Sequence, residues 1–183
     1  MGAAAVFGVG QRTEVEHCYV PEAVAQCAGS ADLLRRLAHD VDFTDTTVSI
    51  GAGADVVWDV LTHDTDALFM GARVDTDWAV GHPITFEGDW DGNQYRDHGT
   101  VQAVDRGTLL QFTQFSSMSG KDDVPENYDL LSIALSSQAD TTDVTMRLAK
   151  PAGVSPPSET EQVGLTENLQ AIFGVLKVRS EAR

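Results

Sequence analysis

Apolar and polar residues alternate through the middle of the chain, which is the pattern of strands that bury one face. The clearest case is residues 83–90, where Ile84 and Phe86 are separated by polar Thr85. Asp91 and Gly92 follow, and both tolerate a positive φ, so we predict a tight hairpin there. The full set of predicted strands is residues 43–50, 72–76, 83–90, 94–104, 108–116, 128–137 and 142–149.

Helical spacing of apolar residues interrupts this pattern in three places. Two short helices are predicted at residues 54–62 and 64–70, directly after the first strand. A third helix is predicted from Ser158, with Glu161 completing a capping box, to about residue 178. Its length of roughly 30 Å is the width of a small domain. Its apolar stripe consists of Val163, Leu165, Leu169, Ile172, Phe173 and Leu176.

The order of these elements predicts an α+β domain over residues 43–180. Strands joined by short turns form an antiparallel sheet, and a long amphipathic helix after such a sheet buries its stripe on the concave face. Residues 1–42 differ from the rest, and we expect a weakly structured or helical extension there. Within it, Ser30 precedes Leu33, Leu34 and Leu37 at the spacing of a short amphipathic helix.

Charge excludes several classes of partner. Acidic residues outnumber Lys and Arg by 28 to 12, so neither nucleic acid nor an anionic membrane is an expected partner. No apolar run approaches the roughly 18 residues needed to cross a bilayer, so membrane insertion is not expected. The two cysteines, Cys18 and Cys27, form no Cys-x-x-Cys motif, which favours a reducing compartment. We therefore expect an acidic cytoplasmic protein, either a monomer or a homodimer.

No catalytic, metal or cofactor motif stands out. His63, His82 and His98 fall at turns or on a sheet face, where a solvated histidine is the ordinary case. Asp97 and His98 are neighbours in one predicted strand, so their side chains point to opposite faces and do not meet. We therefore predict no catalytic residue, no metal site and no cofactor, and the residues favour a binding protein over an enzyme.

Several short motifs resemble the activator-of-Hsp90-ATPase-homologue family, a branch of the START/Bet v1-like (SRPBCC) superfamily. They are Val57-Trp58-Asp59-Val60-Leu61-Thr62, Gly81-His82-Pro83-Ile84-Thr85-Phe86, Gly88-Asp89-Trp90, Gly99-Thr100-Val101, Pro125-Glu126-Asn127-Tyr128 and the helix Asn168 to Lys177. The resemblance covers residues 43–180 and implies a helix-grip fold, a curved antiparallel sheet around the C-terminal helix. Many relatives carry a tryptophan near the position of Leu169.

This fold implies a cavity between the sheet and the helix, and hence binding of a small apolar or amphipathic ligand such as a lipid, polyketide or isoprenoid. The resemblance also leaves open an Hsp90 co-chaperone-like role and, as a third alternative, a cyclase or hydrolase using His98 or Tyr128. Gln111, Gln114, Tyr95 and Arg147 could supply polar contacts. The candidate cavity residues are Phe69, Trp78, Phe86, Trp90, Tyr95, Phe112, Phe115, Tyr128, Leu165, Leu169 and Phe173.

Overall fold

The computed structural model describes residues 41–150 and 157–183, and its strands form one antiparallel sheet. The strand order is β1-β7-β6-β5-β4-β3-β2, so the first strand pairs with the last. The strands are β1 (Val41–Ile50), β2 (Arg73–Asp75), β3 (Pro83–Trp90), β4 (Asn93–Asp105), β5 (Leu109–Gln114), β6 (Asp129–Gln138) and β7 (Thr141–Lys150).

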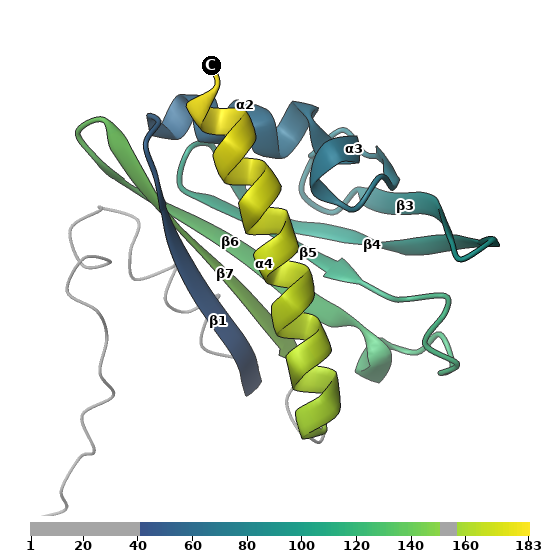
Figure 1. The fold of residues 1–183 in the computed structure, drawn as a ribbon. Helices are drawn as coiled ribbons and strands as arrows, with labels where there is room; N and C mark the ends of the chain where they lie inside the picture. The colour runs from purple at the N-terminus through teal and green to yellow at the C-terminus, as the bar shows by residue number, and fades with distance from the viewer. Residues whose placement is uncertain (1–40, 151–156) are drawn as a thin grey trace, which may run out of the picture.

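Helices cover one face of this sheet (Figure 1). The long helix α4 (Glu159–Glu181) crosses that face diagonally, and α2 (Ala54–His63) and α3 (Thr65–Leu68) lie beside its C-terminal half. A 3₁₀ turn, η2 (Pro125–Asn127), leads into β6. The predicted α+β fold, with a curved sheet around the last helix and two short helices after the first strand, is confirmed.

Local signals placed most element boundaries correctly. Asp91 and Gly92 have φ values of 52° and 79°, as the predicted hairpin between β3 and β4 requires. At the start of α4, the Ser158 hydroxyl accepts from the Glu161 backbone N–H and the Glu161 carboxylate accepts from the Ser158 backbone N–H. Both halves of the predicted capping box are therefore present.

Two elements end two residues before their predicted boundaries. The helix expected over residues 64–70 ends at Leu68, and Met70 and Gly71 both have positive φ. The strand expected over residues 108–116 ends at Gln114, because Asp97 binds the backbone N–H of Ser117 and turns the chain out of the ladder. The helix predicted from Ser30 lies outside the described residues.

Four aromatic rings fill the core beneath α3. The Phe86 ring lies 5.2 Å from Phe69 and 5.7 Å from Phe112, and Trp78 lies 6.3 Å from Phe112. The Trp78 indole N–H also donates to the Thr62 carbonyl oxygen at 3.1 Å, which fixes its ring against the end of α2. The predicted aromatic core is thus a closely packed cluster with edge-to-face contacts.

The C-terminal end of α4 is tied to the segment that follows β1. The Glu181 carboxylate accepts from the Gly51 backbone N–H at 2.9 Å, and the Lys177 ammonium donates to the Ser49 carbonyl oxygen at 3.0 Å. Arg183 pairs with the carboxylates of Asp59 and Asp64. These contacts close the space between α4 and the sheet at this end.

Candidate functional site

The concave face of the sheet carries rows of side chains, because residues paired across antiparallel strands point to the same side. One row consists of Leu110, Ile133 and Met146 on β5, β6 and β7, and all three are fully buried. The next row consists of Phe112, Leu131 and Leu148, which are 0%, 4% and 9% exposed. Leu135, which pairs with Val144 nearer the C-terminus of α4, is 7% exposed, so burial of the sheet face is most complete in the row of Leu110, Ile133 and Met146.

The inward stripe of α4 shows a gradient of burial. Leu176 near the C-terminus is fully buried, Phe173 and Leu169 keep slight exposure, and Leu165 in the N-terminal half is only partly buried. The stripe of α4 thus becomes more accessible toward the N-terminus of the helix. We call the region between α4 and the row Phe112, Leu131 and Leu148 the hollow, and its side toward the N-terminus of α4 the open end.

A polar row follows the apolar ones at the open end. Gln114, Asp129 and Lys150 continue the ladder on β5, β6 and β7, one step beyond Phe112, Leu131 and Leu148. Lys150 forms an ion pair with Asp129 on the neighbouring strand, and its side chain is only 12% exposed. The hollow therefore has an apolar interior and a polar rim, the usual composition of a small-molecule site.

Asp97 extends the polar row onto β4. Its carboxylate accepts from the Gln114 side-chain amide at 3.2 Å and from the Ser117 backbone N–H and hydroxyl at 2.8 and 2.9 Å. The side chain is largely buried, so these three bonds replace the water that the carboxylate loses. Asp97 thereby fixes the loop after β5 and leaves a negative charge at the rim.

Tyr95 lies on the same face as Asp97, next to Gly88 on β3. A Cβ added to Gly88 would lie 2.6 Å from the Tyr95 hydroxyl. Because glycine has no Cβ, the space beside Gly88 is open to the Tyr95 ring. Burial, and secondly the charge of Asp97, raises the pKa of the Tyr95 hydroxyl. The tyrosine is therefore a neutral hydrogen-bonding group at ordinary pH.

The eleven predicted cavity residues fall into separate groups. Phe69, Trp78, Phe86 and Phe112 form the aromatic cluster, with Phe112 reaching the hollow. Trp90 is 59% exposed at the β3–β4 hairpin, and Phe115 and Tyr128 pack against each other beside His98. Those that border the hollow or its rim are Tyr95, Phe112, Leu165, Leu169 and Phe173.

Sequence reasoning missed part of the same wall. Leu131 and Leu148 border the hollow, but the alternation in β6 and β7 does not tell which face is the concave one. Of the predicted polar contacts, Gln114 and Tyr95 lie at the rim, whereas Gln111 bonds to Ser132 on the other face of the sheet. Arg147 shares that other face, since it pairs across the ladder with Ser132.

A second polar group lies on the other side of β4. As expected, Asp97 and His98 face apart: the His98 Nε2 lies 3.1 Å from both the Asp123 carboxylate and the Tyr128 hydroxyl. The Tyr128 hydroxyl in turn donates to Asp123 at 2.6 Å. A proton on Nε2 satisfies both acceptors, so the three side chains join the loop after β5 to β4 and β6. No serine, threonine or cysteine side chain of the described residues bonds to this histidine, so the group lacks a paired nucleophile.

The Tyr128 bond predicts a loss of stability in alkali. The hydrogen bond to Asp123, followed by burial and the Asp123 charge, raises the pKa of Tyr128. A group with a raised pKa in the folded state stabilises fully below its unfolded value of about 10 and loses that contribution as pH rises through the folded value. We expect the free energy of unfolding to fall above about pH 10, and to fall less steeply in Tyr128→Phe.

Urea unfolding on both sides of the tyrosine pKa measures this difference. Tyr95→Phe is the matched control, because burial rather than a hydrogen bond is the main cause of its raised pKa. Tyr95→Phe should remove the separate contribution of Tyr95 to the fall in the free energy of unfolding at high pH. Equal slopes for Tyr128→Phe and the unmodified protein would contradict the assigned role of the Asp123 bond.

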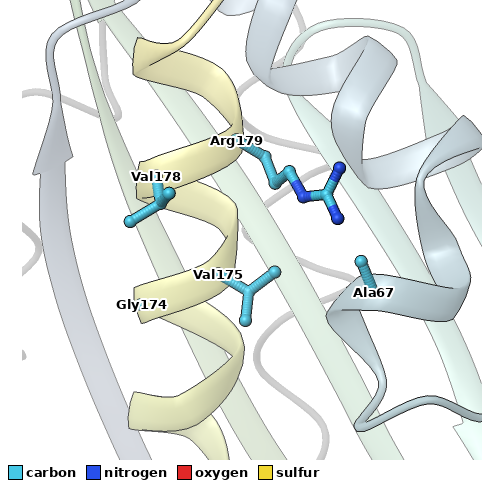
Figure 2. A pocket seen from close by; sticks show the side chains of 5 residues that line it. All are labelled: Ala67, Gly174, Val175, Val178 and Arg179. Atoms are coloured by element: carbon cyan, nitrogen blue, oxygen red, sulfur yellow. The ribbon is translucent and has the colours of Figure 1, made fainter.

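A separate pocket of 460 Å³ lies between α3 and α4 (Figure 2). Figure 2 shows Val175 and Arg179 of α4 directed toward Ala67 of α3. Gly174 and Val178 also line the pocket. The pocket opens broadly to solvent and is distinct from the hollow.

In the described ranges, no helix is long and apolar enough to span a membrane, and no cluster of His, Cys, Asp and Glu is placed to hold a metal ion.

Solved structures with the same fold include proteins of distant sequence. The ChR145 protein from Cytophaga hutchinsonii is 27% identical, with a TM-score of 0.63 over 76% of this chain and 92% of that one. Ara h 8.0201 is 11% identical, with a TM-score of 0.62 over 76% and 97% of the two chains. DynU16, from the dynemicin biosynthetic locus, is 18% identical, with a TM-score of 0.58 over 73% of this chain and 45% of that one.

These similarities show a Bet v1-like helix-grip fold. A search of curated proteins found no significant match. The family model described as "Activator of Hsp90 ATPase homolog 1-like protein" matches residues 52–181, from the turn after β1 to the end of α4. The chain therefore belongs to the family of activator of Hsp90 ATPase homolog 1-like proteins, as its sequence motifs indicated.

Proposed function

We propose that this protein binds a small apolar or amphipathic ligand in the hollow between α4 and the sheet. The apolar surface between α4 and the sheet carries the proposal: Leu165 on the inward stripe of α4 is only partly buried, and Leu148 on β7 keeps 9% exposure. Large apolar side chains in a packed interior are normally covered on all sides. An apolar guest would cover the remaining surface, and that burial favours binding by about 25 cal/mol per Å² before the cost of association.

The polar rim supports the same function. A ligand that is apolar throughout would need no hydrogen-bonding partners. The row beyond the apolar wall on β5, β6 and β7 is nevertheless polar, and in the described chain it consists of Gln114, Asp129 and Lys150. Such a rim suits an amphipathic molecule, with its apolar body under α4 and its polar end at the row. The fold itself commonly holds hydrophobic ligands, which agrees with this placement.

Thermal unfolding and native mass spectrometry with a panel of lipids, polyketides and isoprenoids test the proposal. We expect at least one class to raise the unfolding temperature and to appear as a bound mass. Leu148→Trp would fill the hollow from β7, and it should abolish the shift while the protein stays folded. Val178→Trp is the control, because Val178 is exposed on α4 outside the hollow and the added ring should leave binding unchanged.

Two results would contradict the proposal. One is a panel without any bound mass or shift. The other is stimulation of an Hsp90-type ATPase by the unliganded protein, unaffected by Leu148→Trp, since the family is described by homology to an activator of that enzyme. The second result would indicate that the protein acts through the surface of the domain on a protein partner.

A further inference from the structure

Among the described residues, the charges around the open end of the hollow are acidic on balance. Asp97 and Asp129 stand in the polar row, and Glu161 stands in the first turn of α4. The cations nearby are Lys150 and Lys121, whose charges both act on Glu161. Hydrogen bonds from Ser158, and secondarily these two charges, lower the pKa of Glu161, so it is ionised at neutral pH.

Lys150 is the cation closest to the apolar wall, and it is already paired. Its ammonium bonds to the Asp129 carboxylate on the adjacent strand, and little of its side chain reaches solvent. A ligand carboxylate at this position would have to share Lys150 with Asp129 and approach the Asp129 charge in a partly dry site. Like charges repel more strongly there than in water, so the pair should repel an anionic end group.

The same carboxylates can accept a hydrogen bond from a neutral group. An ionised carboxylate has about four acceptor positions, and Asp97 uses three of them on Gln114 and Ser117. Asp129 bonds to Lys150 and sits beside Gln114 in the row. A hydroxyl group at the open end can therefore donate to the rim without adding charge.

Resting on the binding function proposed above, we propose that the ligand is a neutral amphiphile whose polar end donates a hydrogen bond, such as an alcohol. The Asp129–Lys150 pair at the rim then selects against a carboxylate on the same apolar body. The selection follows from which charges face the hollow and does not depend on the identity of the apolar part.

Isothermal titration calorimetry of the full chain with a ten-carbon alcohol and the matching carboxylate measures this selectivity at neutral pH. We expect the alcohol to bind at least tenfold more tightly, a difference of about 1.4 kcal/mol. Desolvation of a carboxylate alone also favours the alcohol. The deciding measurement is therefore the change in selectivity caused by Asp129→Asn.

Asp129→Asn keeps the shape of the side chain and releases Lys150 from its partner. Carboxylate affinity should rise about tenfold or more. Alcohol affinity should fall, because the amide oxygen of asparagine accepts a weaker hydrogen bond than the Asp129 carboxylate does. Asp105→Asn is the matched control, because it removes the same charge at the exposed last residue of β4 and should change neither affinity. Lys150→Met, which removes the cation, should weaken carboxylate binding further.

The outcomes separate this inference from the proposed function. If neither probe binds and the wider panel also fails, the binding function itself is wrong. If the carboxylate binds the unmodified protein as tightly as the alcohol does, the hollow binds ligands but the selectivity is wrong. An unchanged carboxylate affinity in a folded Asp129→Asn protein would likewise overturn the role of the ion pair.

Discussion

Replacing Gly99 with alanine is expected to lower the free energy of unfolding by about 3 kcal/mol or more. A Cβ at Gly99 would lie 1.7 Å from the Thr113 carbonyl oxygen on β5 and 2.5 Å from its carbon. These are backbone atoms, so no side chain can rotate away to make room. β4 and β5 would have to separate next to the His98–Phe115 bridge, and the hydrogen bonds of that bridge would weaken.

Gly164→Ala is the control: it makes the same glycine-to-alanine change, and the expected change in the free energy of unfolding has the opposite sign. Gly164 lies inside α4, and nothing lies within 4 Å of the Cβ that alanine would add. Alanine is the better helix former, so this variant should be more stable than the unmodified protein by up to about 1 kcal/mol. Urea unfolding of both variants measures the two effects. A loss below about 1 kcal/mol for Gly99→Ala would show that β4 and β5 adjust easily at this point.

Local signals in the sequence predicted the fold well because each depends on a few neighbouring residues. The capping box needs only Ser158 and Glu161, and the β3–β4 hairpin needs only Asp91 and Gly92. The end of β5 was misplaced because a contact distant in sequence determines it. Asp97 binds Ser117 from twenty residues away, and nothing near Ser117 in the sequence signals that bond.

The site was less predictable, because its location depends on how the sheet curves. Alternation gives two faces to every strand but does not say which face is concave. Phe115 and Tyr128 fit an apolar pattern as well as Phe112 does, yet their rings lie 5.5 Å apart beside His98, away from the hollow. The prediction named mainly aromatic residues and therefore omitted Leu131 and Leu148, although aliphatic side chains form much of the wall.

The ion pair at the rim could not be predicted from the sequence pattern either. Lys150 and Asp129 are separated by twenty other residues, and each alone resembles a solvated charge. They become neighbours only through the register of β6 with β7, where Leu130 pairs with Ala149. The polar row therefore follows from strand pairing, and the sequence pattern of either strand alone does not contain it.

Phe112→Ala is expected to cost about 3–5 kcal/mol of folding free energy. Phe112 is fully buried, and its ring lies 5.7 Å from Phe86 and 6.1 Å from Phe69. Removing it deletes the contacts of the whole ring and leaves a space that these neighbours cannot fill without moving from α3 or β3. Chemical unfolding followed by tryptophan fluorescence measures the loss, since Trp78 is also a neighbour of this ring.

Trp90→Ala serves as the matched control, because it removes a larger aromatic side chain that is mostly exposed at the β3–β4 hairpin. Its cost should stay within about 0.5 kcal/mol. A cost for Phe112→Ala below about 2 kcal/mol would contradict close packing around the ring. Phe112 would then border empty space on its α4 side as well, and the hollow would extend to the aromatic cluster and admit a correspondingly larger ligand.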